Sequence, residues 1–394
     1  MLNAGVAASV LSKTAFGGVF RSRPGAARMQ EELGYHTIQS VTFGDVRMQY
    51  PRFVGKNARL DVHGYGPRIG ICTITTDKGA TGWASLRGGR GDAERRVSEL
   101  VGKKLSDVFH VDAGITDDRY IPFDIALHDL AGVALNKPVY ALLGRETPFT
   151  TKYYSGMIYF DDLEPAHAPG GIDKVLANCR YDYDYGYRQF KLKIGRGHRW
   201  MSQKEGLARD IEVTKRVAEA FPDCEILVDG NNGFTVSEFI EYLEGIGNTQ
   251  LFWIEEPFHE TVQDYRALRD WMAKNKVKSL LAEGEADPDP ALLDELMRQK
   301  LMDVHISDIE GLGFTNWRKL MPSLVQYGVQ ASPHAWGSLL KTFYTAHMAG
   351  GLGNTVTIEG VTSTSDDVDL SAYTIKDGKL VPPTAPGFGL TLLR

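Results

Sequence analysis

Two lysines stand two residues apart inside an apolar run, in the stretch FKLKIG at residues 190–195. Residues i and i+2 of a β-strand point to the same side, roughly 6–7 Å apart, so Lys191 and Lys193 are expected to point the same way. Two close ammonium groups lower each other's pKa, and burial lowers it further. A lysine whose pKa is lowered in this way is a general base near neutral pH. We assign that role to Lys193, and we expect Lys191 to lower its pKa and to contact an anionic group.

Three short apolar runs further along the chain each end in carboxylates: Asp229 in EILVDGN, Glu255 in LFWIEEP and Glu285 in SLLAEGEA. Carboxylates that are brought together repel one another unless a cation lies between them. Oxygen ligands that leave room for water and substrate suit Mg²⁺. The sequence therefore predicts a magnesium site on these three residues, with Glu283 as the alternative to Glu285.

Asp308 and His334 lie at the ends of the next two runs, MDVHISDI and GVQASPHAW. A carboxylate beside a histidine fixes the tautomer of the ring and raises its basicity. We expect these two residues to form a dyad that faces Lys193 across the metal. One acid/base group on each side of a bound carboxylic acid, together with a metal, suits removal of an α-proton to give an enediolate.

These residues belong to a regular alternation of strand-like and helix-like segments that begins after residue 150. Eight apolar runs end in polar residues, and helical stretches such as EGLARDIEVTKRVAEAF lie between them. The alternation predicts an α/β fold, a modified TIM-type (β/α) barrel with its active site at the carboxyl ends of the strands. A doubly wound open sheet is the rival fold, but no G-x-G-x-x-G follows an early strand.

The character of the sequence divides the chain into four segments. Residues 1–35 are expected to be a loosely ordered extension, with the remnant of an export signal as the alternative. In residues 36–150, strand patterns precede helical patterns, which predicts an α+β capping domain. Residues 151–361 form the predicted barrel, and residues 362–394 are expected to pack back on the capping domain.

The composition of the 394 residues is that of an ordinary globular protein, with 43% hydrophobic and 24% charged residues and a net charge of −6. Acidic and basic residues are interspersed, and the sequence has no basic stripe that would suggest a nucleic-acid partner. The sequence has no run of about 20 apolar residues, so we expect no membrane span. The three cysteines form no CxxC motif, so a thiolate metal site is not expected. We expect a cytoplasmic protein, or an exported one if the first residues are a signal remnant.

The motifs KLKIG, VDGNNG, WIEEP, AEGEA, SDIEGLGFTNW and SPHAWGS together resemble the enolase superfamily, and within it the mandelate racemase-like subgroup, from about residue 36 onward. The resemblance implies Mg²⁺ on the three carboxylates, Lys193 as base on one face and the His334–Asp308 dyad on the other. The segment SDIEGLGFT is one residue shorter than the usual spacing of the family, which leaves Ser307 as the alternative to Asp308.

The resemblance also assigns two contacts. Asn231, two residues after the first metal ligand, is expected to contact the substrate or a water on the metal. Glu359, in TIEGV, matches a position that often hydrogen-bonds the substrate carboxylate. Many relatives are homo-oligomers, so the resemblance implies a homo-oligomer here too.

The reaction shared by the family is abstraction of the proton α to a carboxylate. We expect dehydration of an acid sugar to a 2-keto-3-deoxy acid, because the polar residues Lys56, Asn57 and His63 of the expected capping loop suit a hydroxylated substrate. A racemase or epimerase of a 2-hydroxy acid is the alternative within the same chemistry. A catalytically silent acid-binding protein on the same fold is an alternative from another class. A metal hydrolase is a third, but it has no need of paired lysines.

Overall fold

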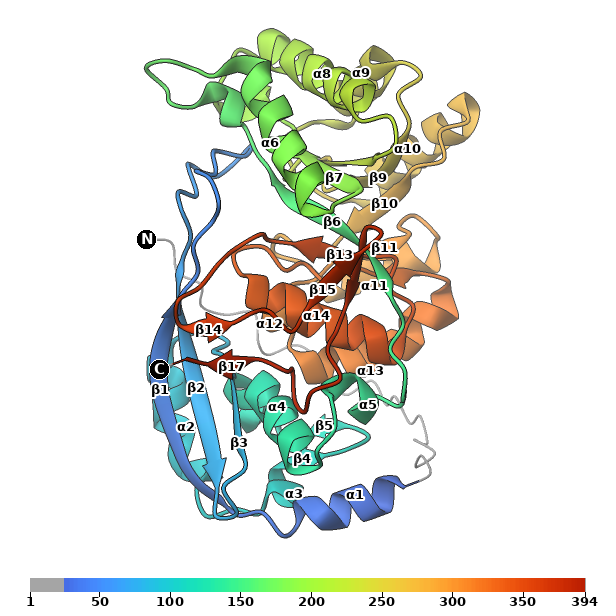
Figure 1. The fold of residues 1–394 in the computed structure, drawn as a ribbon. Coiled ribbons are helices and arrows are strands. Elements are labelled where there is room, and N and C mark those ends of the chain that lie inside the picture. The colour runs from blue at the N-terminus through green and yellow to red at the C-terminus, as the bar shows by residue number, and fades with distance from the viewer. Residues whose placement is uncertain (1–24, 394) are drawn as a thin grey trace.

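A three-stranded sheet with short helices forms one end of the molecule, and a strand barrel surrounded by helices forms the other (Figure 1). The structure, a computed structural model, describes residues 25–393. The sheet is antiparallel in the order β1 (Ile38–Arg47), β2 (Arg68–Thr76), β3 (Thr81–Ser85). The tight β2–β3 connection uses Gly79 at φ +81°, a backbone conformation that glycine adopts without steric cost. The remaining elements of this end are α2 (Arg90–Leu100), α3 (Leu105–Val108), β4 (Phe109–His110), β5 (Gly114–Ile115), the 3₁₀ helix η1 (Asp118–Phe123), α4 (Asp124–Ala134) and α5 (Val139–Leu142).

Eight parallel strands form the barrel, and they coincide with the eight apolar runs of the sequence. They are β6 (Thr151–Ile158), β7 (Gln189–Lys193), β8 (Glu225–Asp229), β9 (Leu251–Glu255), β10 (Leu280–Glu283), β11 (Val304–His305), β12 (Gln330–Ala331) and β13 (Thr357–Gly360). Each strand from β6 to β11 pairs with the next, and β13 pairs with β6. A parallel bridge between Ala331 and Thr355 closes the ring. The prediction of a TIM-type barrel with an α+β capping domain is confirmed.

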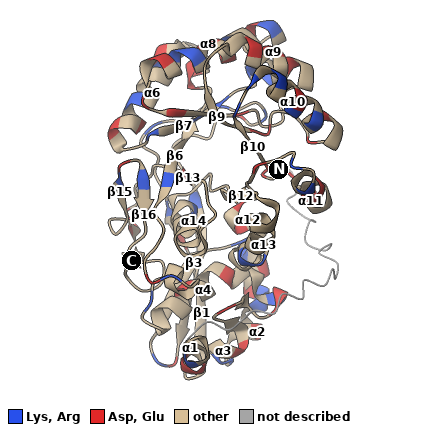
Figure 2. Ribbon diagram, turned by 90° about the vertical axis from the view of Figure 1, so that its right-hand side faces the viewer, with Lys and Arg blue, Asp and Glu red and all other residues tan. Residues whose placement is uncertain are grey.

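Helices connect the strands and cover the outside of the barrel (Figures 1 and 2). They are α6 (Gly171–Tyr185), α7 (Arg196–Arg199), α8 (Gln203–Ala220), α9 (Val236–Ile246), α10 (Val262–Asn275), α11 (Pro290–Arg298), α12 (Ile309–Leu312), α13 (Phe314–Tyr327) and α14 (Leu339–Leu352). Helix α9 illustrates how the local sequence sets the start of a helix and its buried face. Thr235 and Glu238 form a capping box at its start, and Phe239, Tyr242 and Ile246 bury one face at helical spacing.

Acidic and basic residues are interspersed along the outer helices in Figure 2. The figure agrees with the interspersed acidic and basic residues of the sequence. Among residues 25–393, no helix is both long and apolar enough to cross a membrane.

The first described residues differ from the loosely ordered extension that was expected for residues 1–35. Residues 26–33 form helix α1 (Ala26–Leu33), and Leu33 is fully buried. The Gln30 side chain donates hydrogen bonds to the carbonyl oxygens of Ser106 and Phe109 at 3.1 and 3.0 Å. The helix is therefore ordered by burial and by hydrogen bonds to the capping domain. Residues 1–24 lie outside the described residues.

The C-terminal segment contacts both ends of the molecule. Its strands are β14 (Val368–Asp369), β15 (Thr374–Lys376), β16 (Lys379–Val381) and β17 (Thr391–Leu392). The buried carboxylate of Asp129, in α4, accepts hydrogen bonds from the backbone N–H groups of Phe388 and Trp83 at 2.7 and 2.8 Å. The segment therefore packs on the capping domain, whereas the β15–β16 hairpin pairs with the start of β6 in the barrel.

The loop between β1 and β2 extends from the capping sheet to the barrel (Figure 1). The guanidinium group of Arg52 makes two 2.7 Å hydrogen bonds to the Asp182 carboxylate of α6 and one of 3.2 Å to the Met157 carbonyl oxygen. The N–H of Gly55 donates to Asp161 Oδ1 at 2.7 Å. Bidentate arginine–carboxylate pairs are among the strongest hydrogen-bonded pairs in proteins, so this loop is held firmly on the barrel.

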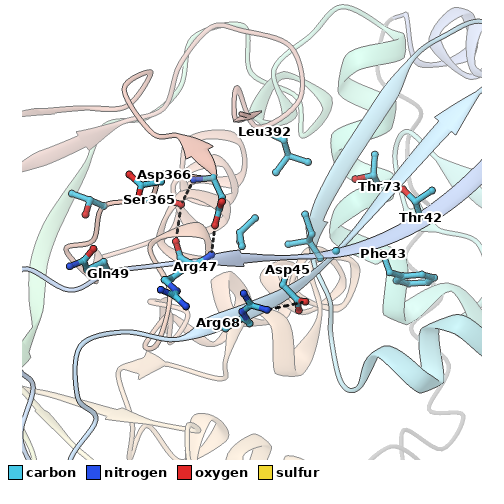
Figure 3. A pocket seen from close by; sticks show the side chains of 15 residues that line it. Thr42, Phe43, Asp45, Arg47, Gln49, Arg68, Thr73, Ser365, Asp366 and Leu392 are labelled. Atoms are coloured by element: carbon cyan, nitrogen blue, oxygen red, sulfur yellow. Dashed lines mark hydrogen bonds and ion pairs between the residues drawn. The ribbon is translucent and has the colours of Figure 1, made fainter. Parts of the chain in front are cut away.

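A separate groove of about 510 Å³ lies between β1, β2 and the C-terminal segment (Figure 3). Asp45 of β1 and Arg68 of β2 form an ion pair of 3.8 Å in its lining, and the backbone N–H of Arg47 donates to Asp367. None of the residues to which the sequence assigned chemistry lines this groove.

Candidate active site

Three carboxylates meet at the carboxyl ends of neighbouring strands. Asp229 and Glu255 are the last residues of β8 and β9, and they are direct neighbours in the register of the sheet. Glu285 follows two residues after β10 ends. One carboxylate oxygen from each residue lies within 4.8 Å of the others. The barrel therefore brings together the three residues that the sequence selected as metal ligands.

The chemistry of this cluster fits a hard divalent cation. The Oε2 atoms of Glu255 and Glu285 are buried and have no hydrogen-bond partner among residues 25–393. Buried carboxylate oxygens without a partner carry a large desolvation cost. Burial, and then the nearby charge of Asp229, raises the pKa of Glu255 well above its ordinary value. A divalent cation that binds these carboxylate oxygens as ligands would satisfy them and favour the charged form of the carboxylates.

Glu283, the alternative third ligand, points elsewhere. It is buried and accepts a hydrogen bond from the hydroxyl group of Tyr265 in helix α10. Glu256 has a supporting role that the sequence reasoning missed. Its Oε1 atom accepts hydrogen bonds from the backbone N–H groups of Glu285 and Ala286 at 3.1 and 2.6 Å. Glu256 thereby fixes the loop that carries Glu285, and the only sequence signal for it is the second acid of WIEEP.

Both lysines of β7 are buried and face the carboxylates. Lys191 Nζ lies 2.7 Å from Glu255 Oε1, 2.9 Å from Glu359 Oε1 and 3.4 Å from Asp229 Oδ2. Lys193 Nζ donates a hydrogen bond to Asp229 Oδ2. The two side chains therefore point to the same side of the strand, as their spacing predicted.

The expected lowering of the lysine pKa values is wrong for this structure. Burial lowers the pKa of Lys191, but Glu255 and Glu359 raise it by more, so it lies well above its ordinary value. Burial and Lys191 also lower the pKa of Lys193, and the opposing charge of Asp229 gives a net increase. The like charge of two neighbouring lysines lowers their pKa values, but the carboxylates that face them in the fold raise both by more.

His334 and Asp308 form the expected pair. His334 Nδ1 lies 2.9 Å from Asp308 Oδ2, and His334 Nε2 lies 3.2 Å from Glu285 Oε1. Burial raises the pKa of Asp308, but the charges of Lys341 and His334 outweigh it and hold this pKa well below its ordinary value. Ser307, the alternative dyad residue, is hydrogen-bonded to the ring of His305 at 2.9 Å. The structure therefore places Asp308, and not Ser307, beside His334.

Glu359 and Asn231 lie beside the same cluster. Glu359, in β13, accepts a 2.7 Å hydrogen bond from the N–H of Ala335 and lies beside Lys191. Burial raises the pKa of Glu359, but Lys191 and then His334 lower it to about 2. The N–H of Asn231 donates to Asp229 Oδ1 at 2.9 Å, and its own Oδ1 is buried without a partner among the described residues. Contacts of either residue with a substrate stay predictions.

Two of the three capping-loop residues that were expected to suit a substrate are engaged in other contacts. Lys56 Nζ pairs with Glu164 at 2.7 Å. Asn57 Oδ1 accepts hydrogen bonds from the N–H groups of Arg59 and Leu60 at 2.9 and 2.6 Å, which stabilises a turn of the loop. These contacts support the conformation of the loop itself.

His63, the third of these residues, belongs to an aromatic wall beside Lys193. Its ring lies 4.7 Å from the ring of Tyr159 and 5.4 Å from that of Trp336. The Tyr159 ring centroid lies 5.3 Å from Lys193 Nζ. His63 Nδ1 is 2.9 Å from the Gly55 carbonyl oxygen, so it donates and leaves Nε2 as an acceptor. Burial, and to a smaller extent Lys193, lowers the pKa of His63, which favours this neutral form.

Comparisons with known proteins agree with this geometry. Residues 174–394 match the family described as "Enolase C-terminal domain-like". The chain is 26% identical to arabinonate dehydratase of Saccharolobus solfataricus, over 68% of each protein. It is 23% identical to D-xylonate dehydratase of Haloferax volcanii, over 93% of this chain and 94% of that protein.

A solved relative is galacturonate dehydratase from Geobacillus sp., which is 28% identical to this chain. The magnesium complex of a mutant of this enzyme has a TM-score of 0.85 and covers 91% of this chain and 93% of that one. A second structure, with D-galacturonate and 5-keto-4-deoxy-D-galacturonate, has a TM-score of 0.83 and covers 91% and 95% of the two chains.

Proposed function

Because this chain belongs to the enolase superfamily, in its mandelate racemase-like subgroup, we propose that it dehydrates an acid sugar to a keto-deoxy acid. The reaction removes the proton α to the substrate carboxylate and expels the hydroxyl group of the neighbouring carbon as water. The names of the arabinonate, xylonate and galacturonate dehydratases support this substrate class. The observation that carries the proposal is the position of two acid/base groups, Lys193 and His334, at the two ends of the carboxylate cluster.

We infer that Asp229, Glu255 and Glu285 hold Mg²⁺, a metal that is also present in the galacturonate dehydratase structure. Bound there, it supplies positive charge that stabilises the negative charge developing on the substrate carboxylate.

Lys193 removes the α-proton in this proposal. Its ammonium group must first lose its own proton, and the nearby charge of Lys191 favours that loss once Asp229 no longer pairs with Lys193. Lys191, fixed between Glu255 and Glu359, donates hydrogen bonds to the substrate carboxylate.

His334 delivers a proton to the leaving hydroxyl group. Asp308 binds Nδ1 of the ring and so fixes its orientation, with Nε2 toward the carboxylate cluster. The proton given by His334 leaves with the hydroxyl group as water, the proton taken by Lys193 comes from the α-carbon, and the resulting enol tautomerises to the keto acid. The same pair would support racemisation or epimerisation if a proton returned to the opposite face of the α-carbon instead.

Purified protein incubated with Mg²⁺ and a panel of mono- and dicarboxylic sugar acids in D₂O tests the proposal. Proton NMR follows the α-position, and semicarbazide detects keto acids. Dehydration predicts keto-acid formation that Lys193→Ala and His334→Ala abolish. Deuterium uptake without keto acid would instead assign a racemase or epimerase. If neither keto acid nor deuterium uptake is detected across the panel, although the protein binds Mg²⁺, the result would favour the silent acid-binding alternative.

Two further properties remain predictions. We propose that the protein is a homo-oligomer, which light scattering coupled to size-exclusion chromatography would measure. We also propose a cytoplasmic location, with export as the alternative, which fractionation of the source cells would decide.

A further inference from the structure

The carboxylate of Asp308 accepts hydrogen bonds from four donors. Its Oδ1 atom accepts from the backbone N–H groups of Glu310 and Gly311 at 2.9 and 2.8 Å, at the start of α12. Its Oδ2 atom lies 2.9 Å from His334 Nδ1 and also accepts a hydrogen bond from Lys341 Nζ. The lysine and the histidine therefore share one oxygen.

Lys341 joins the two segments that carry the dyad. It lies in the first turn of α14, and its side chain is only 13% exposed. Besides Asp308, its Nζ atom donates to the carbonyl oxygen of Trp336 at 3.1 Å. Trp336 follows two residues after His334, so one ammonium group ties the histidine loop to the carboxylate that orients the ring.

The contacts of Asp308 continue into the capping domain. Glu310, which follows Asp308 by two residues, accepts a hydrogen bond from the hydroxyl group of Ser85 at the end of β3. The Ser85 hydroxyl also lies 3.2 Å from that of Tyr344, one turn after Lys341 on α14. Lys341 thus holds Asp308 at the start of α12, and Ser85 of the capping domain, which itself contacts Tyr344, holds Glu310.

We propose that Lys341 is a positioning residue of the His334–Asp308 dyad. It fixes the distance between the histidine loop and Asp308 Oδ2, and thereby aims His334 Nε2 at the leaving hydroxyl group. It also compensates the negative charge of Asp308, which is only partly exposed to solvent. Lys341 makes no contact with the three carboxylates among residues 25–393, so it acts through the dyad. The direction of the proton transfer rests on the proposed function.

Kinetics of Lys341→Met, with Mg²⁺ and the best sugar acid of the panel, test the proposal. Removing a residue that orients a catalytic partner typically lowers activity by about 10- to 100-fold. We expect kcat for keto-acid formation to fall in that range with KM within about threefold. Deuterium exchange at the α-carbon should persist, because Lys193 carries it out. Lys341→Arg should restore most of kcat, and the exposed Lys319→Met on α13 should match the wild type.

Three kinetic results would overturn the proposal. An unchanged kcat would show that the contact has no catalytic effect. A rise in KM alone would mean that Lys341 binds the substrate. An equal loss of turnover and of exchange would mean general damage to the site. If Lys341→Met does not fold, Lys341→Gln keeps a polar group at the position and is judged by the same criteria.

A readout that needs no substrate separates this proposal from the proposed function. In protein labelled with ¹⁵N-histidine, the Nδ1–H signal of His334, identified by its loss in His334→Asn, should shift or broaden in Lys341→Met and Lys341→Gln. Lys341→Arg should retain it, and so should Lys319→Met. An unchanged signal in the Met and Gln variants overturns the positioning role. The expected signal changes in a protein that dehydrates no acid sugar would uphold the positioning role and refute the proposed function.

Discussion

His334 and Lys193 occupy opposite ends of the carboxylate cluster. His334 Nε2 lies 3.2 Å from Glu285, which follows β10, whereas Lys193 Nζ donates to Asp229 at the end of β8. Strand β9 lies between those two strands and carries Glu255. A carboxylic acid bound beside the cluster would therefore have an acid/base group on each side. This relationship makes removal of an α-proton and protonation of a leaving group possible in one site.

The third metal ligand can be identified by a matched pair of variants. We expect Glu285→Gln to weaken Mg²⁺ binding about 100-fold or more and to abolish turnover, because it removes one of three anionic ligands. Glu283→Gln should bind Mg²⁺ as the wild type does. Glu283 is buried beside Tyr265, and burial raises its pKa well above the ordinary value, so the neutral amide resembles its protonated form. Isothermal titration calorimetry with Mg²⁺ measures both, and the reverse ranking would transfer the ligand role to Glu283.

The carboxylate of the dyad can be tested in the same way. Asp308→Asn should lower kcat by about 10- to 100-fold, because the amide cannot orient the His334 ring and stabilise its charged form together. Ser307→Ala should stay within about twofold, since the Ser307 hydroxyl group bonds to His305. Steady-state kinetics on the same substrate compare the two. A larger loss in Ser307→Ala would contradict the pairing seen in the structure.

Because Asp129 is buried, we expect the free energy of unfolding to depend on pH. Burial raises its pKa from 3.8 to about 7, although the N–H groups of Phe388 and Trp83 lower it in part. The folded protein therefore holds this proton more tightly than the unfolded chain does. As the pH rises from about 4 to about 7, the unfolded chain loses the proton first, so the free energy of unfolding falls.

Urea unfolding of the wild type and of Asp129→Asn across this pH range isolates the effect, because the amide does not titrate. The stability advantage of the wild type over the variant should shrink between pH 4.5 and pH 7.5 and stay level above that. An advantage that grows with pH would show that Asp129 is ionised in the folded protein.

The capping loop provides a prediction about stability. Removing one partner of a buried ion pair typically costs about 3–5 kcal/mol. Arg52→Met leaves the carboxylate of Asp182 buried without this partner, and should lower Tm by several degrees. Arg95→Met is the control, because the Arg95–Asp92 pair is exposed and such pairs contribute about 1 kcal/mol or less. Thermal unfolding followed by circular dichroism compares them, and equal Tm values would show that the loop is not held by Arg52.

The sequence alone predicted the barrel and the placement of Asp229, Glu255 and the two lysines. Apolar runs of strand length define parallel strands, and the polar residue at the end of each run must then lie on one rim. Alternation along β7 likewise put Lys191 and Lys193 on one side. Such inferences need only the local period and the order of the strands, and the sequence contains both.

The tertiary structure decided everything that depends on partners distant in the chain. Beyond the end of a strand, side-chain direction follows the loop, and the turn at Gly284 with φ +111° brings Glu285 rather than Glu283 into the cluster. The pKa values of the lysines depend on carboxylates contributed by other strands. Lys341 meets Asp308 only because α14 packs against α12. These relationships arise from through-space distances, which no local pattern of residues specifies.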